Sequence, residues 1–320
     1  MCYIAGKSMC AQRAHIDFLE DLDFSQILTN PILDIAARVW EEDRYEAFKV
    51  CYRSMRVVDD LVDNLKSGSR PADLTEARAV QGMIQDWIRS LRDRDSSEPF
   101  MAQLLDAVDC FRMPIWPWER LARAMIYDLT HDGFPTFVQF LRYTEGAAIA
   151  PAAVFMHLCG VSRINADRYT PPSFDVRVAA RPLAVFSYLV HIMRDFQKDH
   201  GEGLNYFADN LLSLHRVSSR DLEQSAQTGN PTEPVRALLQ TYRSIAEYYR
   251  LKARQVMERI TPSLEDRYQL SWELIYELYN QIYQRVTPAR PDFDLAAVQP
   301  EPPAVQACIR QTIADFRHGK

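Results

Sequence analysis

Residues 48–63 read FKVCYRSMRVVDDLVD, an apolar segment that carries polar side chains at helical spacing. Tyr52, Arg56, Asp59 and Asp63 follow steps of three and four residues, while valine and leucine occupy the other positions. Residues at this spacing lie on one side of an α-helix. The segment is therefore predicted to be a largely buried helix with one polar stripe.

A second segment of the same kind lies far along the chain, where residues 191–199 read HIMRDFQKD. Asp195 and Asp199 are again four residues apart, and Tyr188 and His191 extend their stripe toward the amino terminus. Ionised carboxylates in an apolar interior must be paired or must coordinate a metal, because an isolated buried charge costs too much free energy. The chain is therefore predicted to contain two inward-facing ledges of carboxylates.

Two facing carboxylate ledges are suited to divalent cations. Mg²⁺ takes a few carboxylate oxygens, keeps some water and fills its remaining positions with phosphate oxygens of a substrate. The predicted ligand is therefore a diphosphate bound through Mg²⁺, with Mn²⁺ as the alternative ion. Internal ion pairing of the aspartates with Arg53, Arg56 and Arg194 is the competing interpretation.

Length and composition indicate one large domain in a reducing compartment. The chain has 320 residues, of which 47% are hydrophobic, enough for a sizeable core. Its six cysteines include no C-x-x-C pair and are interpreted as free thiols of a cytoplasmic protein. The net charge is −6 and the basic residues are scattered, so no nucleic-acid partner is expected.

The chain shows no apolar signal core near its amino terminus, and its apolar stretches are shorter than the roughly 20 residues of a spanning helix. Membrane contact, if a greasy substrate or product requires it, is expected to be peripheral.

Hydrophobic periodicity of about 3.6 residues recurs from residue 30 almost to the end, and strand-like alternation is hard to find. The predicted fold class is therefore all-α, a single helical bundle. The predicted helices span residues 31–66, 73–92, 98–111, 117–130, 135–160, 175–200, 219–227, 233–258, 262–286 and 302–317. Thr261 and Pro262 are predicted to cap and begin one of them, and residues 67–71 to form a turn.

Both acidic segments resemble the aspartate motifs of the squalene and phytoene synthases, which join prenyl diphosphates head to head. Residues 48–63 are similar to the first motif and residues 191–199 to the second, in the same order and at a similar separation. Tyr127-Asp128-Leu129, Tyr143 and Tyr206 also match positions typical of the family. The resemblance covers roughly residues 25 to 290.

The resemblance implies an isoprenoid (terpenoid) synthase fold, which is a single large helical bundle around a central cavity, with residues 1–25 and 290–320 peripheral. It also implies a Mg²⁺-dependent prenyltransferase. Its substrates would be farnesyl or geranylgeranyl diphosphate, and its product a squalene- or phytoene-type hydrocarbon of isoprenoid and carotenoid biosynthesis. The candidate metal ligands are Asp59, Asp60, Asp63, Asp195 and Asp199. The candidate catalytic residues are Asp59, Asp63, Asp195, Asp199, Tyr143 and His191. The candidate diphosphate-binding residues are Tyr52, Arg53, Arg56, Arg194, Lys198 and Tyr206.

A prenyl diphosphate reacts by losing diphosphate, and the allylic cation that remains needs a dry apolar cavity. The predicted lining residues are Phe48, Tyr52, Phe155, Met156, Phe186 and Tyr188. Glu145 is interpreted as an exposed or paired carboxylate, and His157 as a core residue.

Several positions depart from the family pattern near the substrate. Residues 147–152 read AAIAPA where the family has a glycine-rich helix, Tyr188 and His191 stand in place of glutamine and asparagine, and Leu204 in place of an arginine. The departures leave ionisation of a diphosphate plausible but put two-substrate condensation in question. A single-substrate class I terpene synthase and a non-catalytic member of the fold are therefore the alternatives. Use of NADPH stays open, because the family does not depend on a G-x-G-x-x-G fingerprint.

Overall fold

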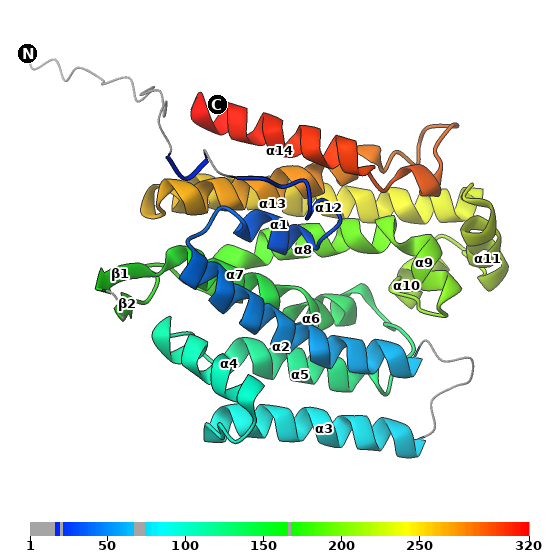
Figure 1. The fold of residues 1–320 in the computed structure, drawn as a ribbon. Helices are drawn as coiled ribbons and strands as arrows, with labels where there is room; N and C mark the ends of the chain where they lie inside the picture. The colour runs from blue at the N-terminus through cyan, green and yellow to red at the C-terminus, as the bar shows by residue number, and fades with distance from the viewer. Residues whose placement is uncertain (1–16, 20–21, 67–73, 166–167, 320) are drawn as a thin grey trace, which may run out of the picture.

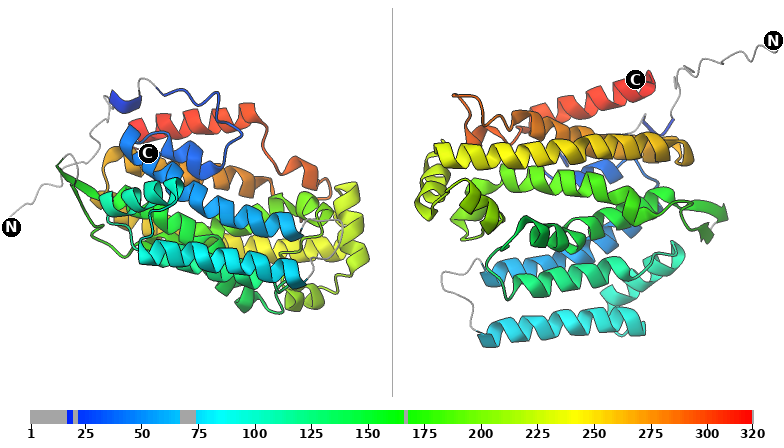
Figure 2. Two further views of the ribbon diagram at one scale, coloured as in Figure 1. Left: turned by 60° about the horizontal axis from the view of Figure 1, so that its bottom comes forward. Right: turned by 180° about the vertical axis from the view of Figure 1, so that it is seen from behind.

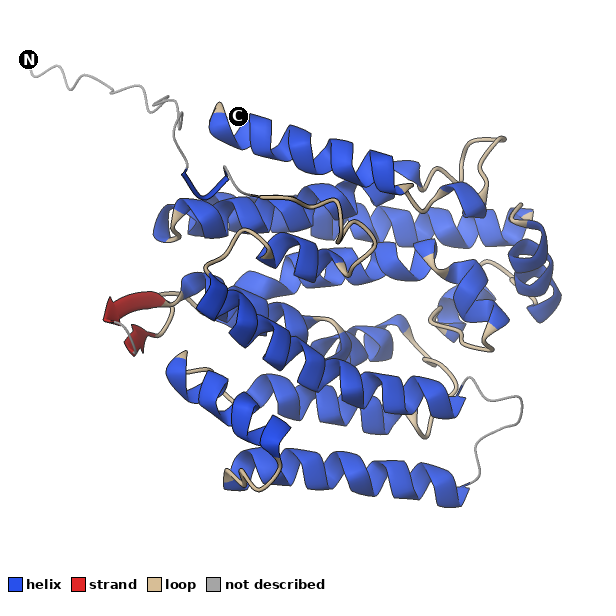
Figure 3. Cartoon of the chain, viewed as in Figure 1, coloured by secondary structure: helices blue, strands red, loops and turns tan. Residues whose placement is uncertain are grey.

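The computed structural model describes residues 17–19, 22–66, 74–165 and 168–319. Within these residues the chain forms fourteen α-helices and one short hairpin. Figure 1 and Figure 3 show the helices packed side by side, with the hairpin projecting at one end. The predicted all-α class is confirmed. The predicted turn at 67–71 lies outside the described residues.

The helices follow each other through short connections. They are α1 (Ile32–Ala37), α2 (Glu42–Lys66), α3 (Leu74–Asp93), α4 (Pro99–Cys110), α5 (Trp116–Asp128), α6 (Phe137–Ala147), α7 (Ile149–Gly160), α8 (Val176–Arg194), α9 (Phe196–Gly201), α10 (Asp209–Leu214), α11 (Ser219–Thr228), α12 (Glu233–Ile260), α13 (Asp266–Arg285) and α14 (Pro302–Arg317). The antiparallel hairpin joins β1 (Ser162–Asn165) and β2 (Arg168–Thr170). Short 3₁₀ turns lie at Asp17–Leu19, Thr261–Ser263 and Leu295–Ala297.

Two predicted helices are each interrupted in the structure, one near Trp40 and the other at Asp195. The predicted helix at 31–66 is interrupted between α1 and α2, where the buried Trp40 donates from Nε1 to Ser271 Oγ at 2.9 Å. The predicted helix at 175–200 is interrupted at Asp195, whose φ of −90° and ψ of 7° leave the helical region. Aspartate tolerates such a break because its side chain bonds locally rather than supporting the helix.

The predicted helix at 135–160 is divided at Ala148, where φ is −122° and ψ is −48°. Pro151 explains the break, because proline has no N–H to donate to the carbonyl of Ala147 four residues earlier. Ala148 and Pro151 both line the central cavity, so this helix break forms part of the cavity wall.

Other boundaries also differ from the prediction. Pro262 does not begin a long helix: it lies in the 3₁₀ turn Thr261–Ser263, and α13 begins at Asp266. The short helix α10 and the hairpin were not predicted, because neither has an apolar repeat long enough to be recognised in the sequence.

Helix α8 lies in the middle of the bundle and packs against α7 and α12 (Figure 2). Among the described residues, it is the one helix long and apolar enough to span a membrane, and more than half of its apolar window is buried. Contacts within the bundle therefore account for its apolar composition.

Buried polar side chains connect the helices that surround the cavity. Arg44 on α2 donates to the carbonyl of Leu158 at the end of α7, at 2.7 Å. Glu145 on α6 pairs with Arg177 and Arg181 on α8, as expected for a paired carboxylate. His157 lies in the core, with its Nε2 2.8 Å from the carbonyl oxygen of Phe111, which confirms its predicted structural position.

Candidate active site

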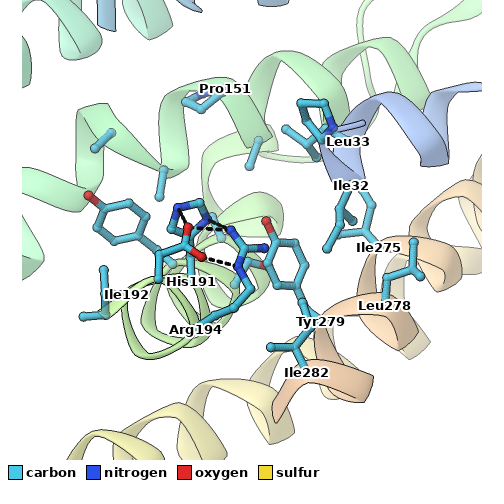
Figure 4. A pocket seen from close by; sticks show the side chains of 18 of the residues that line it. Ile32, Leu33, Pro151, His191, Ile192, Arg194, Ile275, Leu278, Tyr279 and Ile282 are labelled. Atoms are coloured by element: carbon cyan, nitrogen blue, oxygen red, sulfur yellow. Dashed lines mark hydrogen bonds and ion pairs between the residues drawn. The ribbon is translucent and has the colours of Figure 1, made fainter. Parts of the chain in front are cut away.

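A cavity of about 680 Å³ lies between α2, α7, α8 and α13. Figure 4 shows Ile275, Leu278 and Ile282 of α13 on one side and Pro151 of α7 on another. Along α8 the lining changes from alanine and leucine at the amino-terminal end to arginine and aspartate at the carboxyl-terminal end. The cavity thus has an apolar body and an acidic end.

The first aspartate ledge lies at this acidic end on α2. Asp59 and Asp63 line the cavity, whereas the side chain of Asp60 is 51% exposed and does not. Ligand oxygens of all three carboxylates nevertheless lie within 4.8 Å of one another. Burial, together with the charge of Asp63, raises the pKa of Asp59 to about 7. Three clustered carboxylates that repel one another fit a hard divalent cation.

The second ledge lies where α8 gives way to α9. The N–H of Asp199 donates to the carbonyl oxygen of Asp195 at 2.8 Å, so the two residues stay one turn apart across the helix break. Burial raises the pKa of Asp199 to about 7, with contributions from Asp195 and from Asp63 on α2. Asp63 and Asp199 line the same cavity, so the two ledges meet at its acidic end.

Asp195 is held by its own neighbours rather than left free. Arg194 Nε donates to Oδ1 of Asp195 at 2.6 Å and Arg194 Nη2 donates to Oδ2 at 2.7 Å. His191 Nε2 lies 2.9 Å from the same Oδ2 (Figure 4). Burial raises the pKa of Asp195, but the hydrogen bonds from Arg194 and His191 outweigh it and hold that pKa below its ordinary value.

The same network fixes the tautomer of His191. Arg194 Nη2 lies 3.1 Å from Nδ1 of His191, and an arginine can only donate, so Nδ1 is the acceptor. The proton is therefore on Nε2, where it is donated to Asp195. With both ring nitrogens engaged, His191 orients Asp195 in this arrangement.

The remaining candidates differ in position. Tyr52, Arg56, Lys198 and Tyr206 line the cavity, and Arg56 pairs with Asp59 and Asp60. The structure does not bring Arg53 to the cavity. Its guanidinium lies over the ring of Phe100 on α4, 5.2 Å from the centroid. Arg53 directly follows Tyr52, and consecutive helical residues face different directions.

The predicted apolar lining is also divided. Tyr52, Phe155, Met156 and Tyr188 line the cavity, whereas Phe48 and Phe186 do not. Phe48 lies behind the wall, stacked on Tyr52 at 5.4 Å between ring centroids, and Phe186 packs against Tyr276 and Tyr283 of α13.

A buried carboxylate beside the site was not among the predicted site residues. Asp128 accepts from the hydroxyl of Tyr143 at 3.0 Å and from Lys66 Nζ at 2.8 Å. Burial raises the pKa of Asp63, and the charge of Asp128 raises it further. The Tyr127-Asp128-Leu129 match pointed to this residue, but nothing local in the sequence indicated its pairing with Lys66.

Segments from both ends of the described chain also line the cavity. Residues 28–31 precede α1, and residues 32 and 33 begin it. Gln299 and Pro300 precede α14, and Val305 lies near its start. The predicted peripheral segment 290–320 therefore includes part of the cavity wall. No periodicity in the sequence distinguishes a segment that crosses over a cavity from one that lies on the surface.

The fold and the cavity define a prenyltransferase-type enzyme with the isoprenoid synthase fold, and comparison with known proteins agrees. Residues 35–306 match the squalene/phytoene synthase family. Because this match covers most of the chain, the protein belongs to that family, as the two aspartate motifs predicted. No curated protein matches the sequence.

Solved structures of the family share the fold. A dehydrosqualene synthase in complex with ligand is similar with a TM-score of 0.69 and 15% identity, covering 92% of this chain and 94% of that one. Squalene synthase HpnC from Alicyclobacillus acidocaldarius is similar with a TM-score of 0.59 and 15% identity, covering 94% and 97%. The family supports head-to-head prenyl condensation as the general reaction and prenyl diphosphates as the substrate class.

Proposed function

We propose that this protein joins two molecules of farnesyl or geranylgeranyl diphosphate head to head, with Mg²⁺, into a squalene- or phytoene-type product. The observation that supports this most strongly is the cavity itself. Four aspartates from two distant helical segments converge at one end of a pocket whose body is apolar. The proposal places the enzyme in the cytoplasm, with peripheral membrane contact for release of the apolar product.

The acidic end has the donors that Mg²⁺ requires. Asp59, Asp63 and Asp199 are the carboxylates best suited to hold it, because no strong bidentate pair occupies their oxygens in the described structure. Bound Mg²⁺ supplies positive charge that neutralises the departing diphosphate. Arg56 and Lys198 line the same end and donate to phosphate oxygens.

The apolar body protects the cation. Phe155, Met156, Trp272 and Ile275 contribute to a wall that holds the prenyl chains and excludes water. Tyr143 also lines the cavity. Burial raises the pKa of Tyr143 well above the ordinary value, and its hydroxyl donates a hydrogen bond to Asp128, so the hydroxyl stays protonated and oriented.

A single-substrate reaction is the second candidate, and one observation favours it. Ala147, Ala148, Pro151 and Ala152 line the cavity at the position where the family pattern has glycines. These side chains are larger than glycine and leave less room at this part of the cavity wall, which favours one prenyl chain over two.

The test is product analysis of the purified protein with Mg²⁺ and either farnesyl or geranylgeranyl diphosphate, with and without NADPH. A thirty- or forty-carbon product supports condensation, and a fifteen- or twenty-carbon hydrocarbon or alcohol supports the single-substrate reaction. NADPH dependence of the thirty-carbon product would show whether a reductive step is included. Asp59→Asn should abolish diphosphate release. Glu46→Gln, on the exposed side of the same helix, should not.

A further inference from the structure

Both aspartate motifs carry an arginine that pairs with them, but the two arginines lie in different surroundings. The side chain of Arg56 is 47% exposed, and that of Arg194 is 16% exposed. Exposed ion pairs contribute little to binding or stability. Charge-assisted pairs with a bidentate fork in partly buried surroundings contribute more.

The Arg194 fork occupies the carboxylate of Asp195 on both oxygens. Nε donates to Oδ1 at 2.6 Å, and Nη2 donates to Oδ2 at 2.7 Å. His191 Nε2 adds a third contact at 2.9 Å. A cation that binds Asp195 must displace these donors. It must also approach the guanidinium of Arg194, which is positively charged and repels it. In this arrangement Asp195 is therefore not available as a metal ligand.

Arg194 is also placed to bind a different anion. It lines the cavity beside Tyr279, at the end where the aspartates gather (Figure 4). Among the described residues its third nitrogen, Nη1, has no hydrogen-bond partner, so it offers a first contact to an arriving anion. The planar guanidinium fork fits phosphate oxygens as well as it fits a carboxylate.

We propose that Arg194 exchanges partners when substrate binds: the diphosphate takes the guanidinium from Asp195, and Asp195 becomes available to a divalent cation. This inference rests on the proposed function, because it requires a diphosphate and a metal at the same site. Its consequence is that diphosphate and Mg²⁺ promote each other's binding, by an equal factor in each direction. Arg194 is then a diphosphate-binding residue that also keeps the metal site incomplete until substrate arrives.

The test measures Mg²⁺ affinity of the purified protein without diphosphate, by calorimetric titration and by the shift in melting temperature with Mg²⁺. Arg194→Lys keeps the charge but removes the fork, and Arg194→Gln removes both. The exchange predicts that each variant binds Mg²⁺ more tightly than the wild type, Arg194→Gln by about tenfold or more. Circular dichroism checks that each variant is folded.

Matched controls separate release of Asp195 from a simple loss of positive charge. Lys198→Gln removes a charge from the same cavity end, and Arg56→Gln removes the exposed partner of the first motif. Both are expected to change Mg²⁺ affinity by less than about threefold. In an Asp195→Asn background, Arg194→Gln should give no gain, because the ligand it would release is gone.

An unchanged Mg²⁺ affinity in Arg194→Lys and Arg194→Gln overturns the exchange, and so does a gain that persists in the Asp195→Asn background. Neither result touches the proposed function, which is judged by the products that the wild type forms. Failure of the wild-type protein to bind Mg²⁺, even with a prenyl diphosphate present, would instead contradict the metal requirement itself and the exchange with it.

Discussion

The two aspartate motifs have the same spacing, yet the chain builds them differently. The first lies within the long helix α2, where Asp59 and Asp63 carry raised pKa values and Arg56 is largely exposed. The second lies at the break between α8 and α9, where Arg194 and His191 hold Asp195. Equal spacing therefore does not give equal surroundings: the first ledge is paired with a largely exposed arginine, whereas Asp195 of the second is neutralised by the less exposed Arg194.

Loss of a carboxylate should show this difference most strongly in activity. Asp63→Asn removes an inward carboxylate of the first motif and is expected to lower kcat by on the order of 10³-fold, because charge on the departing diphosphate is no longer neutralised. Asp60→Asn, with an exposed side chain outside the cavity, is expected to have a much smaller effect. Steady-state kinetics with a prenyl diphosphate measures both, and equal losses would contradict the distinction.

Loss of a carboxylate should change the stability of the metal-free protein differently in the two motifs. Asp195→Asn breaks a paired network and is expected to lower the free energy of unfolding by about 1–3 kcal/mol. Asp59→Asn removes a charge that burial and Asp63 disfavour, so it should leave stability unchanged or raise it. Urea denaturation at pH 8 without metal decides this. Destabilisation by both variants alike would show that the motifs are equivalent.

The pH dependence of stability should follow the raised carboxyls. The pKa of Asp59 and of Asp199 is about 7 in the folded protein against an ordinary value of 3.8. The folded state then binds more protons than the unfolded state between these values, so stability falls as pH rises through this window. Added Mg²⁺ should restore stability most at pH 8, where both groups are ionised.

Thermal melts from pH 5 to 8.5, with and without Mg²⁺, measure this slope. The double variant Asp59→Asn and Asp199→Asn should flatten it in the metal-free protein. Asp195, whose pKa is lowered, should contribute nothing to the slope in this range. A slope that survives in the double variant would assign it to other groups.

The smallest expected effect concerns neighbouring arginines of the first motif. Arg53→Gln should leave KM within about twofold of wild type, because its guanidinium lies over Phe100 and away from the cavity. Arg56→Gln should raise KM by roughly fivefold, because a charged donor to the diphosphate is lost. Equal effects would contradict the placement of Arg53.

The sequence predicted the parts of the site that depend on local periodicity. Spacing of three and four residues predicted that Asp59, Asp63 and Asp199 face inward, because a helix repeats every 3.6 residues. All three line the cavity. It did not predict the contact of Asp128 with Lys66, which joins α5 to α2 across a long separation in the chain. Pairings of this kind depend on how helices pack.

Helix breaks show the same limit. Pro151 was visible in the sequence, but apolar periodicity on both sides of it favoured a continuous helix, and the structure resolves the conflict with a break at Ala148. Arg53 and Arg56 look equivalent as donors in the sequence. The packing of α2 distinguishes them: Arg56 lines the cavity, whereas Arg53 faces Phe100 of α4.

The most direct test of head-to-head condensation is the isotopic pattern of the product. An equimolar mixture of unlabelled and fully deuterated substrate is converted with Mg²⁺, separately for farnesyl and geranylgeranyl diphosphate, and the product is analysed by mass spectrometry. Condensation predicts unlabelled, half-labelled and fully labelled molecules, with the half-labelled product the most abundant. Products that are only unlabelled or fully labelled would contradict the account, because they arise from one substrate molecule each.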